Sequence, residues 1–292
     1  MPTEQHVGMP DVALRTFETA VQNATRLDAA VRTLGGAARH ALLVRHALLA
    51  TSADLGAVRA LILGGTAAVV ASRPDDTISL TGRLAAAGLA GAVPPRVGEA
   101  LEAIWLRDVR HTASLLNAAE AAGHIVAAAP ASSDSQRAAA LAGAMCLAKG
   151  GLVAAPFLTV WQLDAAARSA AVQVDRSQAW SEWVRAWCSL LAREATNATH
   201  ALRTAEEQFA AERAMARSSP RTGGTDDLVL AWLHATLTFT IRDASAALGL
   251  STPTVGTSIA RLEKAGFAEE LTGQARDRVW TSTALLKLVQ TR

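Results

Sequence analysis

Apolar side chains recur every three or four positions from about residue 10 to about residue 213, which is the spacing of one face of an α-helix. Alanine and leucine, both strong helix formers, supply most of them. Aromatic residues make up 4% of the chain and tyrosine is absent, so residues that favour strands are scarce. We therefore expect a mainly α-helical protein.

Glycine, proline and serine mark the ends of the expected helices. One helix begins near Asp11 and stops before Gly35. Further helices are expected at roughly 37–50, 54–72, 96–122, 135–149 and 178–215.

Three tryptophans recur at helical spacing in the last of these helices: Trp180, Trp183 and Trp187. A stripe of this kind is typical of core packing. We predict that it is buried against the helix that contains Leu141 and Met145.

Residues 218–225 read Ser-Ser-Pro-Arg-Thr-Gly-Gly-Thr, a composition that disfavours a helix and is typical of a linker. A chain of 292 residues is long enough for two modest domains. We therefore expect a helical domain at 1–217, a linker at 218–225 and a second domain at 226–292.

The second domain is expected to begin with a helix capped by Asp226 and to continue with a short helix that a glycine at position 249 closes. Another helix opens at Ser251, whose hydroxyl can cap it, and has Pro253 in its first turn.

Two strand-like pieces, 267–271 and 278–281, follow this helix, and an apolar helix near 285–289 completes the domain. Two short helices joined by a tight turn and followed by a hairpin predict a winged helix-turn-helix.

Such a domain places one helix in the major groove of DNA and its wing on the backbone. The predicted DNA-binding residues are the polar groups on the outer face of that helix and two arginines of the wing: Ser251, Thr252, Thr254, Thr257, Ser258, Arg261, Arg276 and Arg278. Winged helices also bind proteins, and from residue 221 onward eight basic residues stand against seven acidic ones. Because a nearly neutral module binds DNA weakly as a single copy, we expect a homodimer on double-stranded DNA.

One stretch resembles the motif helix of Fic-domain proteins: Ala129-Pro130-Ala131-Ser132-Ser133-Asp134-Ser135-Gln136-Arg137, followed by Leu141 and by the Gly-Leu-Val-Ala-Ala-Pro-Phe-Leu segment at 151–158. That family joins a His-Pro-Phe-x-Asp/Glu-Gly-Asn-Gly-Arg-x-x-Arg signature to an apolar helix and a Gly-Leu-Leu-x-x-Pro turn. Residues 44–56 look like its inhibitory segment, the Trp180 and Trp183 pair looks like its Gly-Asp-Trp-x-x-Trp helix, and many Fic proteins carry a similar C-terminal module. The resemblance extends from about residue 40 to the end.

The resemblance implies a Fic-like helical body without catalytic competence. Ala129 stands where the family has its general base, Ser133 stands where it has its acidic metal-holding residue, and Asp134 stands in the anion-binding turn. Alanine cannot accept a proton and an aspartate repels phosphate. Leu55 occupies the position of the inhibitory glutamate. We therefore expect no enzyme activity and no cofactor.

The remaining sequence features point to an intracellular protein. No apolar stretch reaches the length of a membrane span, the first residues lack the pattern of a signal peptide, and we expect a cytoplasmic, bacterial protein that does not enter a membrane. Cys146 and Cys188 are interpreted as core thiols, and no histidine or glycine spacing indicates a metal site or a phosphate loop.

The sequence therefore predicts a DNA-binding transcriptional regulator whose Fic-like body serves dimerisation or partner sensing. One alternative is a protein-interaction scaffold whose winged helix binds protein. The other is a residual nucleotidyl (AMP) transferase that uses substitute groups such as His124 or Asp134.

Overall fold

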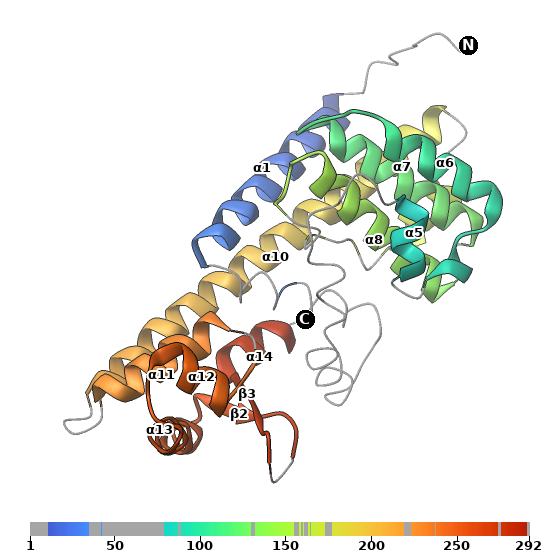
Figure 1. Ribbon diagram of the computed structural model, residues 1–292. Helices are drawn as coiled ribbons and strands as arrows, with labels where there is room; N and C mark the ends of the chain where they lie inside the picture. The colour runs from blue at the N-terminus through green and yellow to red at the C-terminus, as the bar shows by residue number, and fades with distance from the viewer. Residues whose placement is uncertain are drawn as a thin grey trace. The chain divides into compact units, whose positions relative to one another are not determined.

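A computed structural model describes residues 11–34, 42, 79–86, 89–129, 132–154, 158, 160, 163, 165–172, 177–218, 223–236, 238–273 and 276–290 (Figure 1). These residues form helices and one small sheet, so the expectation of a mainly α-helical protein is confirmed. They divide into two compact units. The first contains the described residues up to 28 and from 79 to 197, and the second contains those from 29 to 42 and from 198 onward.

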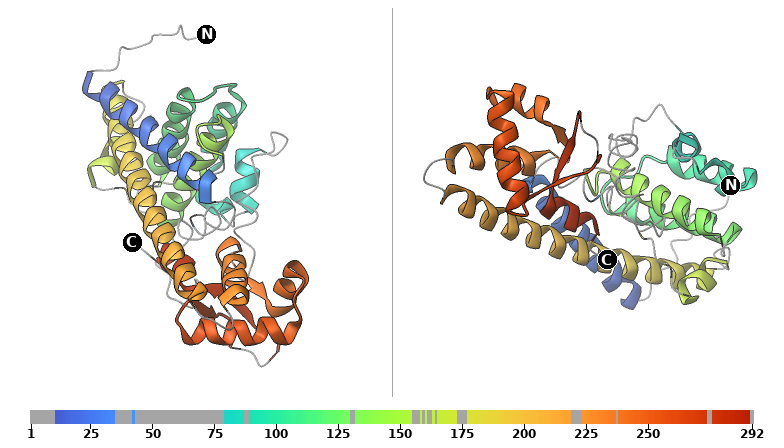
Figure 2. Two further views of the ribbon diagram at one scale, coloured as in Figure 1. Left: turned by 90° about the vertical axis from the view of Figure 1, so that its left-hand side faces the viewer. Right: turned by 90° about the horizontal axis from the view of Figure 1, so that it is seen from below.

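The first unit is helical throughout its described part. It contains α1 (Asp11–Leu34) up to residue 28, α5 (Leu80–Ala86), a 3-10 turn at Ala90–Ala92, α6 (Pro95–Leu106), α7 (Ala113–Ala128), α8 (Ser133–Lys149), α9 (Ala165–Val172) and the first part of α10 (Ser177–Arg217). The alanine-rich helices α7 and α8 pack most extensively against each other and lie side by side in Figures 1 and 2. Their small side chains allow this close approach.

The tryptophans of α10 fill the space against α7 and α8. Trp183 is fully buried, and its Nε1 donates a hydrogen bond of 2.8 Å to the carbonyl oxygen of Ala119 in α7. A Cβ at Gly123 would lie 2.7 Å from the same Nε1, so the indole requires a glycine there. Trp187 is also buried and contacts α8 at Gly143, whereas Trp180 is half-buried. The predicted burial is confirmed for Trp183 and Trp187, but the stripe packs on α7 as well as on α8.

The single helix expected at 96–122 is wrong, because the chain leaves α6 after Leu106 and starts α7 at Ala113. Arg107 has extended backbone angles, and His111 has a φ of 52°. The break is held by tertiary contacts: Arg107 donates two hydrogen bonds to Glu120, and the amide of His111 donates one of 2.6 Å to the carbonyl of Gly150.

The other helix predictions for this region differ in outcome. The helices expected from Asp11 to before Gly35, at 135–149 and at 178–215 correspond to α1, α8 and α10. The short helices α5 and α9 were not expected. The helices expected at 37–50 and 54–72, and the segment around Leu55, lie almost entirely outside the described residues.

The second unit combines helices with a small antiparallel sheet (Figure 1). It contains the last turns of α10, α11 (Gly223–Ala235), β1 (Phe239–Thr240), α12 (Ile241–Leu248), α13 (Thr252–Lys264), β2 (Ala268–Glu270), β3 (Val279–Ser282) and α14 (Thr283–Gln290). The strand order is β1-β3-β2, with Trp280 of β3 opposite Phe239 of β1 on one side and Glu270 of β2 on the other.

The core of the second unit gathers apolar residues from each of these elements except α14: Ala216, Val229, Leu230, Leu233, Phe239, Ala244, Val255, Ile259, Leu262, Ala268 and Trp280. Burial of this apolar surface contributes most of the stability of the unit. The buried positions of α13 are spaced three or four apart, so the opposite side of that helix faces solvent.

The predicted linker and domain boundary differ from the structure. Helix α11 begins at Gly223, so residues 223–225 are helical, and Asp226 lies inside the helix rather than at its cap. The two units divide after residue 197, within α10, and not at residues 218–225. The reason is that the last turns of α10 contribute to the second core, in which Ala216 is buried.

Replacement of Trp183 by alanine is expected to lower the free energy of unfolding by about 3–5 kcal/mol, because the lost indole leaves a cavity between α7 and α10. Trp180→Ala is the matched control, since it removes the same side chain from a half-buried position of the same helix. Urea unfolding checks the pair, and equal losses in the two variants would contradict the packing described here.

Candidate nucleic-acid interface

The predicted helix-turn-helix corresponds to α12, a tight turn and α13. A reciprocal cap fixes the start of α12: Thr240 Oγ1 accepts from the amide of Asp243, and Asp243 Oδ2 accepts from the amide of Thr240. Gly249 ends α12 with a φ of 64°, a conformation that glycine adopts without strain. Ser251 Oγ accepts from the amide of Thr254 and caps α13, as predicted.

One long side of α13 is exposed. Its exposed residues are Thr252, Pro253, Thr254, Thr257, Ala260, Glu263 and Lys264, and the cap residue Ser251 is exposed as well. Four of the predicted contact residues, Ser251, Thr252, Thr254 and Thr257, therefore lie on the solvent side, as expected. Their role in binding DNA stays a prediction.

Ser258 does not lie on this side, and its predicted place on the outer face is wrong. Its exposed fraction is 0%, and its hydroxyl donates to Oδ1 of Asp226 in α11. The position is one of the inward positions of α13, together with Val255, Ile259 and Leu262. A small hydroxyl fits this apolar side because a buried carboxylate accepts its hydrogen bond.

Arg261 is bound to Asp226, an interaction that the sequence did not predict. Its Nε lies 3.0 Å from Asp226 Oδ2 and its Nη2 lies 2.7 Å from Asp226 Oδ1, which is a bidentate pair. The side chain of Arg261 is 38% exposed and that of Asp226 is 8% exposed. Hydrogen bonding to Asp226 raises the pKa of Arg261 above its ordinary value. Arg261 therefore links α13 to α11. The prediction that it contacts DNA assumed a free guanidinium, whereas two of its nitrogens donate to Asp226.

Asp227, the next residue of α11, holds α10. Arg213 donates to it at 2.7 and 3.1 Å, and Arg217 donates to it at 2.9 Å. The hydrogen bonds from Arg213 are the main cause of a pKa of Asp227 below its ordinary value. Two adjacent carboxylates of α11 thus reach two different helices.

A buried polar pair adds to the contact between α10 and α11. Nε2 of His234 lies 2.8 Å from Oε2 of Glu212, and both side chains are almost fully buried. Gln208 donates to the other oxygen of Glu212 at 2.7 Å, and the ring of Phe209 stacks on His234 at a centroid distance of 4.1 Å. Neither this pair nor Asp226 carries a sequence motif, so only the fold identifies them.

The expected wing is the hairpin of β2 and β3, which pair antiparallel (Figure 1). Arg276 is exposed in the connection. Arg278 is also exposed, and its Nε lies 3.7 Å from Oε2 of Glu270. Both arginines are therefore exposed, and their contact with DNA stays a prediction.

The residues that resemble the Fic motif lie around the start of α8. Ala129 directly follows α7 as its C-cap, Ser133 is the first residue of α8, and Pro130 lies outside the described residues. Arg137, which matches a family arginine, forms an ion pair of 3.2 Å with Asp134. His124, which the transferase alternative would use, lies in α7 with its Nε2 3.9 Å from Oε1 of Glu120, one turn earlier in the same helix.

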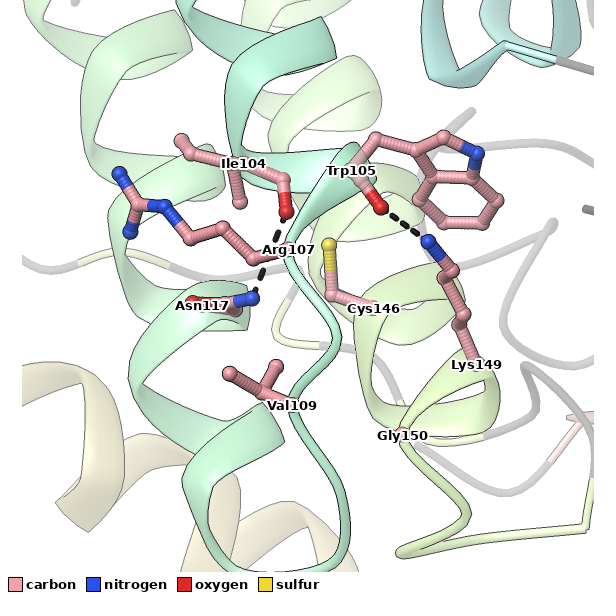
Figure 3. Close-up of a pocket in the computed structure, with 8 residues that line it drawn as sticks. All are labelled: Ile104, Trp105, Arg107, Val109, Asn117, Cys146, Lys149 and Gly150. Carbon is pink, nitrogen blue, oxygen red and sulfur yellow. Dashed lines mark hydrogen bonds between the residues drawn. The ribbon is translucent and has the colours of Figure 1, made fainter.

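A small hollow of about 10 Å³ lies between α6, α7 and α8 (Figure 3). Asn117 donates to the carbonyl of Ile104 at 3.4 Å, and Lys149 donates to the carbonyl of Trp105. The carbonyl of Ile104 also accepts from the amide of Arg107 at 3.2 Å, so these side chains add to the capping of the last carbonyl groups of α6. The Lys149 ammonium also lies 4.6 Å from the centre of the Trp105 ring. Asn117 and Lys149, two polar side chains of the hollow, therefore stabilise the C-terminal end of α6.

A wider surface hollow of about 510 Å³ adjoins it and is lined in part by Arg107, Arg110, His111 and Lys149. Its two inner cations are engaged, Arg107 with Glu120 and Lys149 with the end of α6. The carbonyl end of α8 also lies here, and this end of a helix disfavours anions.

The two cysteines are buried and free, which confirms their interpretation as core thiols. Burial raises the pKa of both Cys146 and Cys188 to about 12, so neither is a reactive thiolate. Within the described ranges, no group of three or more histidine, cysteine and acidic side chains could hold a metal ion. No described helix has the length and apolar character needed to cross a membrane.

In the comparisons with known proteins, no family model matches the chain and no curated protein matches it.

Replacement of Arg261 by alanine is expected to lower the free energy of unfolding by about 1.5–3 kcal/mol, because it removes charge-assisted hydrogen bonds from a buried carboxylate. Arg137→Ala is the matched control, since it breaks an ion pair of which Asp134 is 62% exposed, and should cost about 0.5 kcal/mol or less. Urea unfolding measures both losses, and a loss at Arg261 no larger than that at Arg137 would refute the structural role of the pair.

Acid is expected to destabilise the second unit through Asp227. Its lowered folded-state pKa stabilises the fold above the ordinary carboxyl pKa of 3.8, and this contribution disappears as the pH falls through the lowered value. Asp227→Asn should therefore lower the urea midpoint near pH 6 and flatten its fall on acidification. A pH profile that runs parallel to that of the unchanged chain would contradict the assignment.

Proposed function

We propose that the chain is a DNA-binding transcriptional regulator, in which the second unit forms a winged helix-turn-helix that binds double-stranded DNA. The observation that carries the proposal is α13: it is capped by Ser251, held by Asp226 through its inward side, and exposed along the opposite side. A helix held in this way can enter a major groove without rearrangement. The exposed wing arginines would contact phosphates beside it.

The character of the exposed side favours DNA over a protein partner. Protein interfaces are centred on large apolar or aromatic anchors. Among the described residues, the large apolar side chains that are exposed are Leu14, Leu106, Met215 and Leu228, and none of these lies on α12, on α13 or in the hairpin. The exposed side of α13 instead carries small polar and small apolar groups, followed by Glu263 and Lys264 at its end.

In this proposal the helical body is Fic-like and serves dimerisation or partner sensing without nucleotidyl transfer. Ala129 cannot act as a base, Ser133 cannot replace an acidic metal ligand, and Arg137 is paired with Asp134. The protein acts in the bacterial cytoplasm, as a homodimer on an operator with two half-sites, because dimer symmetry doubles a weak single contact.

Selection of bound duplexes from a random pool at low salt tests the proposal, with the full chain as bait. Enrichment of a site with two related halves supports it. Sedimentation as a strict monomer together with no enriched sequence would overturn it. Incubation of the same preparation with ATP and magnesium, followed by mass measurement, tests the transferase alternative, which predicts that the mass of the protein increases by one AMP group.

Arg276→Ala is expected to weaken binding to all duplexes by a similar factor and to reduce the slope of log K against log salt concentration by about one, because one phosphate contact is lost. Arg185→Ala, which removes an exposed arginine of α10 in the first unit, serves as the control. Affinity measured at several salt concentrations separates them. An unchanged slope in Arg276→Ala would contradict a phosphate contact by the wing.

A further inference from the structure

The threonine hydroxyl groups on the exposed side of α13 are each within hydrogen-bonding distance of another group of the protein. Thr257 donates its hydroxyl to the carbonyl of Pro253 at 2.9 Å. Oγ1 of Thr254 lies 2.7 Å from Oγ of Ser251, and Oγ1 of Thr252 lies 3.5 Å from Oγ of Ser245. Each of these threonines also carries a methyl group, and the exposed Ala260 contributes another methyl group to the same side.

The same side lacks the groups that recognise purines most specifically. Arginine or lysine pairs with guanine, and asparagine or glutamine pairs with adenine. Along α13, every residue of which the structure describes, the arginine is Arg261, and Asp226 already occupies two of its nitrogens. Lys264 lies in the last turn, whereas the first turns of a recognition helix reach the base edges.

We infer that α13 recognises the 5-methyl groups of thymine in the major groove, through the methyl groups of Thr254, Thr257 and Ala260. Threonine and alanine side chains are suited to this apolar contact. The inference rests on the proposed function and names the chemistry that its DNA site presents: T·A pairs opposite the first turns of α13. In this arrangement Arg261 sets the rotation of the helix and does not read a base.

The test uses the duplex enriched from the random pool and replaces each thymine in turn by deoxyuridine, which removes only the methyl group. The dissociation constant is expected to rise about fourfold at each contacted thymine, the value of one buried methyl group. Two results overturn the inference while leaving DNA binding in place. One is an enriched site without thymine in its half-sites, and the other is a dissociation constant that every deoxyuridine duplex shares with the thymine duplex. If no duplex is enriched, the proposed function is wrong, and the inference that rests on it is wrong as well.

Two substitutions at position 257 identify the protein side of the contact. Thr257→Ser keeps the hydroxyl and removes the methyl group, so the thymine-to-deoxyuridine ratio should fall toward one at a contacted pair. Thr257→Val keeps a methyl group and removes the hydroxyl, so the ratio should persist. A ratio lost in the valine variant and kept in the serine variant would show that the hydroxyl oxygen reads the base, and would overturn the assignment.

Thr204→Ser is the matched control. Thr204 is also an exposed helical threonine that donates to the carbonyl four residues earlier, at 3.1 Å to His200, but it lies on α10. Its replacement should leave the ratio unchanged. Far-ultraviolet circular dichroism and a thermal melt of each variant establish that the fold is retained, so that a lost ratio reports the contact.

Discussion

The arrangement of the second unit depends on one buried carboxylate. Apolar burial drives the helices together but does not fix how each one is rotated. Asp226 does so for α13, because it accepts from Ser258 and Arg261, which lie three residues apart on one side of that helix. Successive residues of a helix point about 100° apart, so the adjacent Asp227 reaches α10 instead.

This placement determines what α13 can present to a partner. With Ser258 turned inward and Arg261 bound to Asp226, the exposed residues before the last turn of α13 are threonine, proline and alanine. A bidentate arginine would be expected to choose guanine, whereas small methyl-bearing side chains complement thymine. The same carboxylate that stabilises the fold therefore changes the base chemistry that we propose for the site, and the wing supplies the accessible cation Arg276.

The elements that were predicted correctly depend on contacts between residues close in the chain. Helices α1, α8, α10, α12 and α13 follow from apolar spacing and from caps such as Ser251, and Gly249 marks the turn between the last two. The break between α6 and α7 could not be predicted in the same way, because it depends on Glu120 and Gly150, which lie far from Arg107 and His111 in sequence. Residues 223–225 likewise become helical, although their composition is typical of a linker.

The sequence by itself determined the mainly helical class, the two short helices followed by a hairpin, and the exposed positions of Thr254 and Thr257, since helical periodicity and capping are local properties. Only the tertiary structure decided the roles of Ser258 and Arg261. Their partner Asp226 lies more than thirty residues earlier and on another helix. Periodicity places a side chain on a face of its own helix, but whether that side chain is free or bound depends on which helix packs beside it.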